Sequence, residues 1–211
     1  MPRFTKFLRD SIFLTTFHLD VVVGLLLSDA GLSKQVKNGQ ARLAFKQSMS
    51  HFSVFWSIFM ILSPYCSVVP YTDNATIKIK KYFGIRFDTR TCLCFTMLYD
   101  IFYINNKKVV PQDIFNLLNP IALAYWIIGD GTGNAWRGLY LCTDSFSNYD
   151  VIRLMNVMLI RYEIESKFVF VSGKPRIYIP STQNKKVSKL VINYIHPSML
   201  YKIIGKKSKN N

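Results

Sequence analysis

The sequence predicts an α+β protein built from two copies of one αββαββα unit, with an antiparallel sheet in each copy. Two segments about a hundred residues apart carry this prediction, because both join a helix-like apolar run to a small residue and an aspartate. They are VVGLLLSDA, which contains Asp29, and LAYWIIGDG, which contains Asp130. One aspartate at a helix terminus is ordinary. Two in matching places indicate an internal duplication.

A strand is expected after each of these segments. Residues 41–48 (ARLAFKQS) and 137–145 (RGLYLCTDS) alternate apolar and polar side chains, which is the period of a half-buried strand. Each strand leads into an apolar stretch with helical spacing, at 51–62 in the first copy and 148–162 in the second. The order of elements therefore repeats.

Further strands and a closing helix are expected in both copies. The predicted strands are ATIKIKKYFGIRF (75–87), TRTCLCFTM (89–97), ESKFVFV (165–171) and KPRIYIPS (174–181). A Ser172-Gly173 turn joins the last two strands. Pro120 suits the first turn of the second motif helix. We therefore expect two halves, residues 1–110 and 111–211.

Composition indicates the class of partner. The chain has 27 Lys and Arg against 12 Asp and Glu, which gives a formal net charge of +15. This charge favours a polyanionic partner, with nucleic acid considered before an anionic membrane. The four cysteines lack the spacing of a zinc site, so we interpret them as reduced and buried. The three histidines are interpreted as structural.

Half of the residues are hydrophobic, so a membrane protein has to be considered. The most apolar stretch, residues 52–71, is broken by Pro64, and its uninterrupted part is shorter than the roughly 20 residues of a spanning helix. It predicts a buried core helix. The basic N-terminal stretch 1–17 lacks a small-residue cleavage site and contains Asp10, so no cleavable signal is expected.

Several further segments follow one another in a fixed order. They are NNKKVVP at 105–111, LYLCTDSFS at 139–147, KPRIYIPS at 174–181 and HPSMLYK at 196–202. Together with the two aspartate segments, this set resembles the LAGLIDADG homing endonucleases, in the single-chain form encoded by mitochondrial introns. The resemblance covers nearly the whole chain. It implies a pseudo-twofold protein in which two antiparallel sheets form a DNA-binding saddle.

The resemblance also implies an activity and a cofactor. The expected protein is a metal-dependent endonuclease that makes a double-strand break in a long asymmetric DNA target and so promotes intron mobility. Asp29 and Asp130 would be catalytic and would hold Mg²⁺, or Mn²⁺ in its place, together with the backbone carbonyls of Ser28 and Gly129. The metals would activate water and stabilise the departing 3′ oxygen.

Three other side chains match positions of the family's active site. Lys108 and Lys202 lie in matching places of the two halves, where a family lysine supports the water network or the transition-state charge. Gln47 resembles the polar residue that positions water, and Thr143 is its expected counterpart in the second copy. We therefore expect Gln47, Lys108 and Lys202 to join the two aspartates in catalysis.

Basic side chains on the predicted strands are candidates for contact with DNA, because a β-ribbon can enter the major groove. They are Arg42, Lys46, Lys78, Lys80, Arg137, Lys167, Lys174 and Arg176.

Close packing of the two motif helices requires small side chains. Gly24, Ser28 and Gly129 supply them. Tyr125 and Trp126 stand where the family has a small residue and a leucine, so we expect an asymmetric interface.

The expected partner is double-stranded DNA, and the chain's own intron RNA is a second expected ligand. We expect no membrane partner and a monomeric chain. The expected location is an organelle, the mitochondrion before the chloroplast.

Three alternatives stay open. An RNA maturase would assist group I intron splicing, with or without DNA cleavage, but it needs neither aspartate. A DNA-binding module with degenerate catalysis would follow if Tyr125 distorts the metal site. Glu165-Ser166-Lys167 matches the E-x-K pattern of restriction-type nucleases, a short motif that is common by chance.

Overall fold

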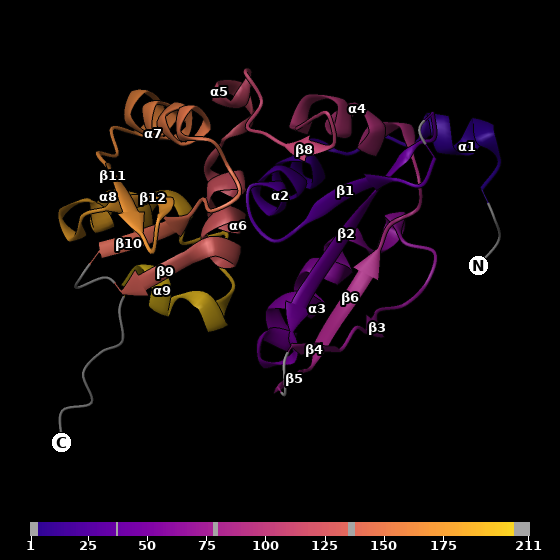
Figure 1. Ribbon diagram of the computed structural model, residues 1–211, viewed down its shortest axis with the longest axis horizontal. Helices are drawn as coiled ribbons and strands as arrows, with labels where there is room; N and C mark the ends of the chain where they lie inside the picture. Colours follow the sequence, from indigo (N-terminus) through magenta and orange to yellow (C-terminus); the bar gives the residue numbers. More distant parts are fainter. Residues whose placement is uncertain (1–3, 37, 78–79, 135–137, 205–211) are drawn as a thin grey trace. The chain divides into compact units, whose positions relative to one another are not determined.

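The structure is a computed structural model, and its contacts divide the chain into two compact units. The first comprises Met1–Leu19 and Asp29–Tyr103, and the second comprises Asp20–Ser28 and Ile104–Asn211. The boundary therefore falls inside the first motif segment, between Ser28 and Asp29. The residues that the structure describes are 4–36, 38–77, 80–134 and 138–204 (Figure 1).

The first unit combines an antiparallel sheet with helices. Its elements are α1 (Lys6–Ser11), β1 (Gly31–Lys34), β2 (Ala41–Ser48), α3 (Phe52–Leu62), β3 (Tyr71–Thr72), β4 (Ala75–Ile77), β5 (Lys80–Tyr82), β6 (Gly84–Asp88) and α4 (Leu93–Phe102), with 3₁₀ turns at Met49–His51 and Ser63–Tyr65. The main sheet has the order β1-β2-β6-β3. Phe45 of β2 packs against Phe55 of α3 and Phe87 of β6, with ring centroids 5.8 and 5.7 Å apart.

Two of the predicted strands in this unit are corrected. Residues 89–97 were expected to form a strand, but the chain is helical from Leu93 onwards as α4. The buried residues Cys94, Phe95, Leu98 and Phe102 recur at the spacing of one helix face, which outweighs the apparent alternation of the preceding residues. The segment 75–87 forms not one strand but the hairpin β4–β5 followed by β6.

The second unit repeats this plan. Its elements are α5 (Ile114–Leu117), α6 (Pro120–Asp130), β9 (Gly131–Asn134), β10 (Gly138–Cys142), α7 (Asn148–Tyr162), β11 (Lys167–Val171), β12 (Lys174–Ile179), α8 (Asn184–Val191) and α9 (Tyr201–Ile204), with 3₁₀ turns at Ser181–Gln183 and Pro197–Met199. A hairpin of β7 (Tyr103–Ile104) and β8 (Lys107–Lys108) precedes them. Ser172 and Gly173 have φ angles of 53° and 76°, as a two-residue hairpin requires.

The duplication predicted from the sequence is confirmed by the sheets. The second sheet has the order β11-β12-β10-β9, which read in reverse matches β1-β2-β6-β3 element for element. The register agrees as well. Gly31 pairs with Ala44 in the first sheet, and Thr132 pairs with Tyr140 in the second. Gln47 lies three residues after Ala44, and Thr143 lies three residues after Tyr140, so these two residues occupy equivalent positions. The α+β fold with two antiparallel sheets is as expected.

The helix α2 (Thr16–Leu26) packs beside α6 in the second unit (Figure 1). A Cβ atom on Gly24 would lie 2.3 Å from the Ala122 carbonyl oxygen and 2.6 Å from the Tyr125 Cβ, so only glycine allows this approach. Tyr125 occupies the corresponding position of α6 and is buried. The contact therefore places a glycine of one helix against a tyrosine of the other, which is the asymmetry that the sequence predicts.

The apolar stretch after residue 51 forms a short helix. α3 ends at Leu62, and Pro64 lies in the 3₁₀ turn that follows. Val54, Phe55, Ile58 and Leu62 are buried on one side of this helix. Within the described ranges, no helix combines the length and the apolar character that crossing a membrane requires.

Candidate active site and nucleic-acid interface

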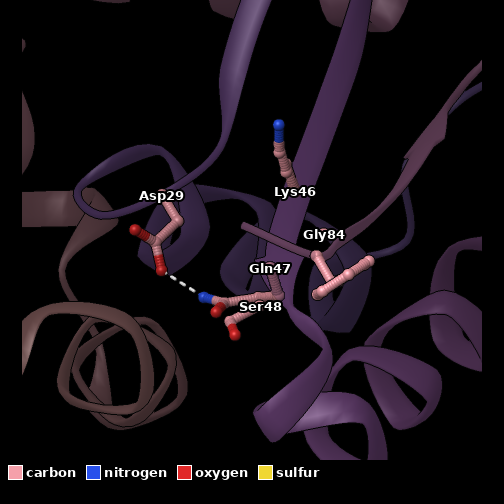
Figure 2. A pocket seen from close by; sticks show the side chains of 6 residues that line it. Asp29, Lys46, Gln47, Ser48 and Gly84 are labelled. Atoms are coloured by element: carbon pink, nitrogen blue, oxygen red, sulfur yellow. Dashed lines mark hydrogen bonds between the residues drawn. The ribbon is translucent and has the colours of Figure 1, made fainter. Parts of the chain in front are cut away.

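Asp29 follows the first motif helix and is exposed. The side-chain amide of Gln47, at the end of β2, donates a hydrogen bond to Asp29 Oδ2, and the two side chains face each other in Figure 2. The strand position explains this contact. Gln47 is two residues after the buried Phe45, so it lies on the same face of β2. Its side chain therefore points inward where the core ends.

A cavity of about 310 Å³ opens beside this pair. Gly84 and Phe83 line it together with Asp29 and three consecutive residues of β2, Lys46, Gln47 and Ser48. The Lys46 side chain extends away from the Asp29 carboxylate (Figure 2) and pairs with Asp73, with 3.1 Å between Nζ and Oδ2. The cavity thus presents one carboxylate and its amide partner to a ligand.

Asp130 ends the second motif helix and is half-buried. Its surroundings differ from those of Asp29. The Thr143 hydroxyl donates to the Pro175 carbonyl at 2.7 Å and is buried there, so the counterpart of Gln47 is engaged elsewhere. Burial raises the pKa of the nearby Cys142 thiol, Arg176 lowers it, and the negative charges of Asp130 and Asp144 raise it further.

Two lysines bind the ends of the motif helices in the same way. Lys108 Nζ donates to the carbonyls of Leu26 at 2.8 Å and Ser28 at 3.4 Å. Lys202 Nζ donates to the carbonyls of Ile127 at 3.2 Å, Ile128 at 2.6 Å and Gly129 at 3.5 Å. The last carbonyls of a helix lack intrahelical donors and carry partial negative charge, so an ammonium group stabilises both ends.

The donor set suits a divalent cation that is bound together with substrate. Among the residues that the structure describes, no group of three or more His, Cys, Asp or Glu could hold a metal ion, and all four cysteines are free thiols. Mg²⁺ is usually held by one or two carboxylates plus substrate phosphate and water. The carbonyls of Ser28 and Gly129 accept from lysines, but a carbonyl oxygen has a second lone pair.

On the outer face of the first sheet, basic side chains are paired with acids. Arg86 Nη2 lies 2.7 Å from Asp88 Oδ1, and the Tyr71 hydroxyl donates to Asp88 Oδ2 at 2.6 Å. Burial alone would raise the pKa of Asp88, but these two hydrogen bonds and the nearby charges of Arg86 and Arg42 lower it below its usual value. The pairing holds the side chains of this face in fixed positions.

The second sheet has a similar but smaller ion-pair cluster. Arg176 Nε lies 3.2 Å from Asp144 Oδ1, and Lys174 Nζ lies 3.4 Å from Asp144 Oδ2. The hydrogen bond from Arg176 is the main reason that the pKa of Asp144 lies below its usual value. Arg86 and Arg176 occupy equivalent strand positions, opposite Lys46 and Cys142 respectively.

The predicted DNA-contact residues are distributed over both sheets. Arg42 and Lys46 lie on β2, Lys167 on β11, and Lys174 and Arg176 on β12. Lys80 lies in β5, whereas Lys78 and Arg137 fall outside the described residues. Sequence reasoning missed their acidic partners Asp73, Asp88 and Asp144. These pairs join residues on different strands or loops, which no local spacing reveals.

The fold and the repeated aspartate-ended helices define the class of protein. A family model described as the LAGLIDADG DNA endonuclease family matches residues 19–187, and the chain belongs to this family. The cytochrome b mRNA maturase bI2 of Debaryomyces hansenii is 33% identical over 193 residues, which cover 88% of this chain and 72% of that protein.

Two further similarities extend the comparison. The maturase bI2 of Saccharomyces cerevisiae is 29% identical over 200 residues, 88% of this chain, which spans about half (47%) of that relative. A structure of the homing endonuclease I-WcaI bound to its DNA recognition sequence superposes with a TM-score of 0.85 at 26% identity, covering 93% of this chain and 89% of that one.

Proposed function

We propose that this chain is a homing endonuclease that makes a divalent-metal-dependent double-strand break in a long asymmetric DNA target and so promotes intron mobility. The observation that carries the proposal is a repeated arrangement, in which an aspartate lies at the C-terminal end of each motif helix and a lysine binds the last carbonyls of that helix. Two equivalent helix ends suit the cleavage of two DNA strands.

Each side chain then has a role in this reaction. A divalent cation, when bound, supplies an activated water and stabilises the departing 3′ oxygen. Asp29 and Asp130 are the carboxylates that would hold divalent cations, with the carbonyls of Ser28 and Gly129. Gln47 orients the Asp29 carboxylate through its hydrogen bond.

The lysines are positioning residues in this proposal. Lys108 and Lys202 fix the helix ends from which the aspartates project. Two ammonium groups there also contribute positive charge that stabilises the negative charge developing on the phosphate in the transition state.

Double-stranded DNA is the proposed partner of a monomeric chain. The net charge of +15 and the basic side chains on the sheet faces support it, because phosphate neutralisation dominates affinity for DNA. Relatives that are named for cytochrome b mRNA support an organelle as the location, the mitochondrion before the chloroplast.

A second function is favoured by the names of two relatives. Both bI2 proteins are called mRNA maturases, so we also propose that the chain can bind its own intron RNA and assist splicing. This function requires neither Asp29 nor Asp130.

The decisive experiment is cleavage of the intron-less host allele by the purified chain in Mg²⁺. We expect double-strand breaks from the wild type and a loss of them in Asp29→Asn and in Asp130→Asn. Asp100→Asn is a matched control, because Asp100 is an exposed aspartate that pairs with Lys34, 2.8 Å away, outside the cavity. Tight binding of intron RNA without any DNA cleavage would leave the maturase as the function.

A further inference from the structure

A second cavity of the first unit is lined by arginines and lies apart from the Asp29 cavity. Its volume is about 540 Å³. Arg9 of α1, Arg42 of β2 and Arg90, which follows β6, line it, and none of its described lining residues is acidic. The rest of its described lining consists of Phe4, Gln35, Ser67, Thr89 and Thr91.

Two of the arginines bury donors that lack an acceptor. Within the described part of the chain, the Nε–H groups of Arg9 and Arg42 are buried and have no hydrogen-bond partner. Arg9 reaches Thr91 Oγ1 only through Nη1, at 3.4 Å. A buried donor without an acceptor is costly, so these two guanidinium groups carry unsatisfied hydrogen-bonding capacity beside the cavity.

Asp88 forms an ion pair with Arg42 but does not accept a hydrogen bond from its buried Nε–H group. Its Oδ1 lies 3.8 Å from Arg42 Nε, beyond hydrogen-bond distance. Both carboxylate oxygens already accept from Arg86, and Oδ2 also accepts from the Tyr71 hydroxyl. Arg42 therefore remains the arginine of this face that a ligand can engage.

An aromatic ring packs against one of the three arginines of the cavity. The Arg90 Cζ lies 3.9 Å from the centroid of the Phe4 ring, a cation–π contact that orients the guanidinium plane. A hydrogen bond with Cys94 lowers the pKa of the neighbouring Cys92 thiol, burial opposes this, and the charges of Arg9 and Arg90 lower it further. The positive potential of both arginines thus acts on the groups around the cavity.

We propose that this cavity binds one backbone phosphate of the double-stranded DNA target, with Arg9, Arg42 and Arg90 as its ligands. The planar guanidinium group matches a phosphate in a bidentate hydrogen-bonding geometry. The inference rests on the proposed function, because it extends the DNA contact of β2. Arg42 and Gln47 are five residues apart on that strand, on the order of 17 Å. This corresponds to about five base-pair steps from the cleaved bond.

The experiment measures how the dissociation constant for a short random-sequence DNA duplex depends on salt. Each phosphate contact contributes about 0.9 to the slope of log affinity against log salt. We expect Arg9→Gln and Arg90→Gln each to reduce the slope by up to this amount. The double variant should lose little more than either single variant, because both side chains hold the same phosphate.

Two control variants make this test specific. Lys6→Gln removes one exposed charge from the same helix as Arg9 and should change the slope less than Arg9→Gln. Arg9→Lys retains the charge and should keep most of the slope, and thermal unfolding followed by circular dichroism establishes that every variant is folded. Equal slopes for Arg9→Gln and Lys6→Gln, or additive losses in the double variant, would overturn the phosphate site.

Two further outcomes separate this inference from the function on which it rests. If Arg9→Gln and Arg90→Gln reduce the salt-dependence slope for binding of an RNA hairpin but not for the DNA duplex, the cavity binds RNA and the proposal is overturned. Cleavage of the intron-less allele is scored separately. If the wild type cleaves but the arginine variants keep the wild-type slope, only the phosphate site is disproved. If the arginine variants have reduced slopes but the wild type does not cleave, only the endonuclease function is disproved.

Discussion

At the scale of single residues, Gln47 and its counterpart Thr143 make different hydrogen bonds. Asp29 accepts from Gln47, but the equivalent Thr143 donates to a backbone carbonyl. We predict that Gln47→Ala slows cleavage about 10- to 100-fold, the usual effect of removing a group that orients a ligating carboxylate. The slower step should concern one DNA strand, so nicked plasmid should accumulate when a supercoiled plasmid that carries the target is digested.

The matched control for this prediction is Gln40→Ala. Gln40 also donates its side-chain amide to a carboxylate, that of Asp10, but it does not line the Asp29 cavity. If both variants convert supercoiled plasmid to linear product at the same rate, Gln47 has no special role.

The two lysines at the motif helices differ in burial, and this predicts a difference in stability. Lys202 is 6% exposed, and its ammonium group binds three carbonyls. Lys202→Met removes the lysine donor from the carbonyls of Ile128 and Gly129 and should lower the free energy of unfolding by about 1–3 kcal/mol. Lys108 is half-buried, so Lys108→Met should cost less. Urea unfolding of both variants measures the difference, and a larger loss in Lys108→Met would contradict this account.

At the scale of elements, the first sheet depends on the ionised Asp88. Because its folded-state pKa is below the usual value, the carboxylate stabilises the sheet at neutral pH. This stabilisation is lost as the pH falls through the folded pKa. The difference in unfolding free energy between wild type and Asp88→Asn should therefore be largest near neutral pH and shrink in acid. A difference that stays constant from neutral pH into acid would exclude the ion pairs as its source.

The contact between α2 and α6 predicts an unusual response to alanine. In an exposed helix, Gly→Ala gains roughly 1 kcal/mol from helix propensity. Gly24→Ala would instead place its Cβ 2.3 Å from the Ala122 carbonyl oxygen, and overpacking of this kind costs about 1–3 kcal/mol. We therefore expect a lower melting temperature by differential scanning calorimetry. A melting temperature at or above that of the wild type would mean that α2 can move away from α6 without loss of stability.

The elements also show how far sequence reasoning reaches. Alternation identified β2 and β10, and Pro120 marked the start of α6, because these features are local. The strand expected at residues 89–97 was wrong, since a short apolar run fits either period and only packing of Phe95 and Phe102 decides. The arginine cavity was not predicted, because its ligands come from three segments that only the tertiary fold brings together.

At the scale of the whole molecule, the second unit is discontinuous in sequence. Residues 20–28 belong to it by their contacts, although residue 104 begins its main part. A fragment of residues 104–211 would lack the partner of α6 and expose Ala122 and Tyr125, which are buried in the full chain. We expect this fragment to show no cooperative thermal unfolding, and the same fragment with residues 20–28 joined to it through a flexible linker to recover it. A cooperative transition of the unlinked fragment would show that α2 is dispensable.

The discontinuity of this unit also has a consequence for synthesis on the ribosome. All residues from Val21 to Leu27 are buried in the finished fold. Within this stretch, Gly24 packs against Ala122, which lies 98 positions later in the chain. At elongation rates of about 5–20 residues per second, this apolar stretch emerges several seconds before its partner exists. The nascent chain must therefore keep this apolar helix from binding other molecules while the rest of the first unit is synthesised.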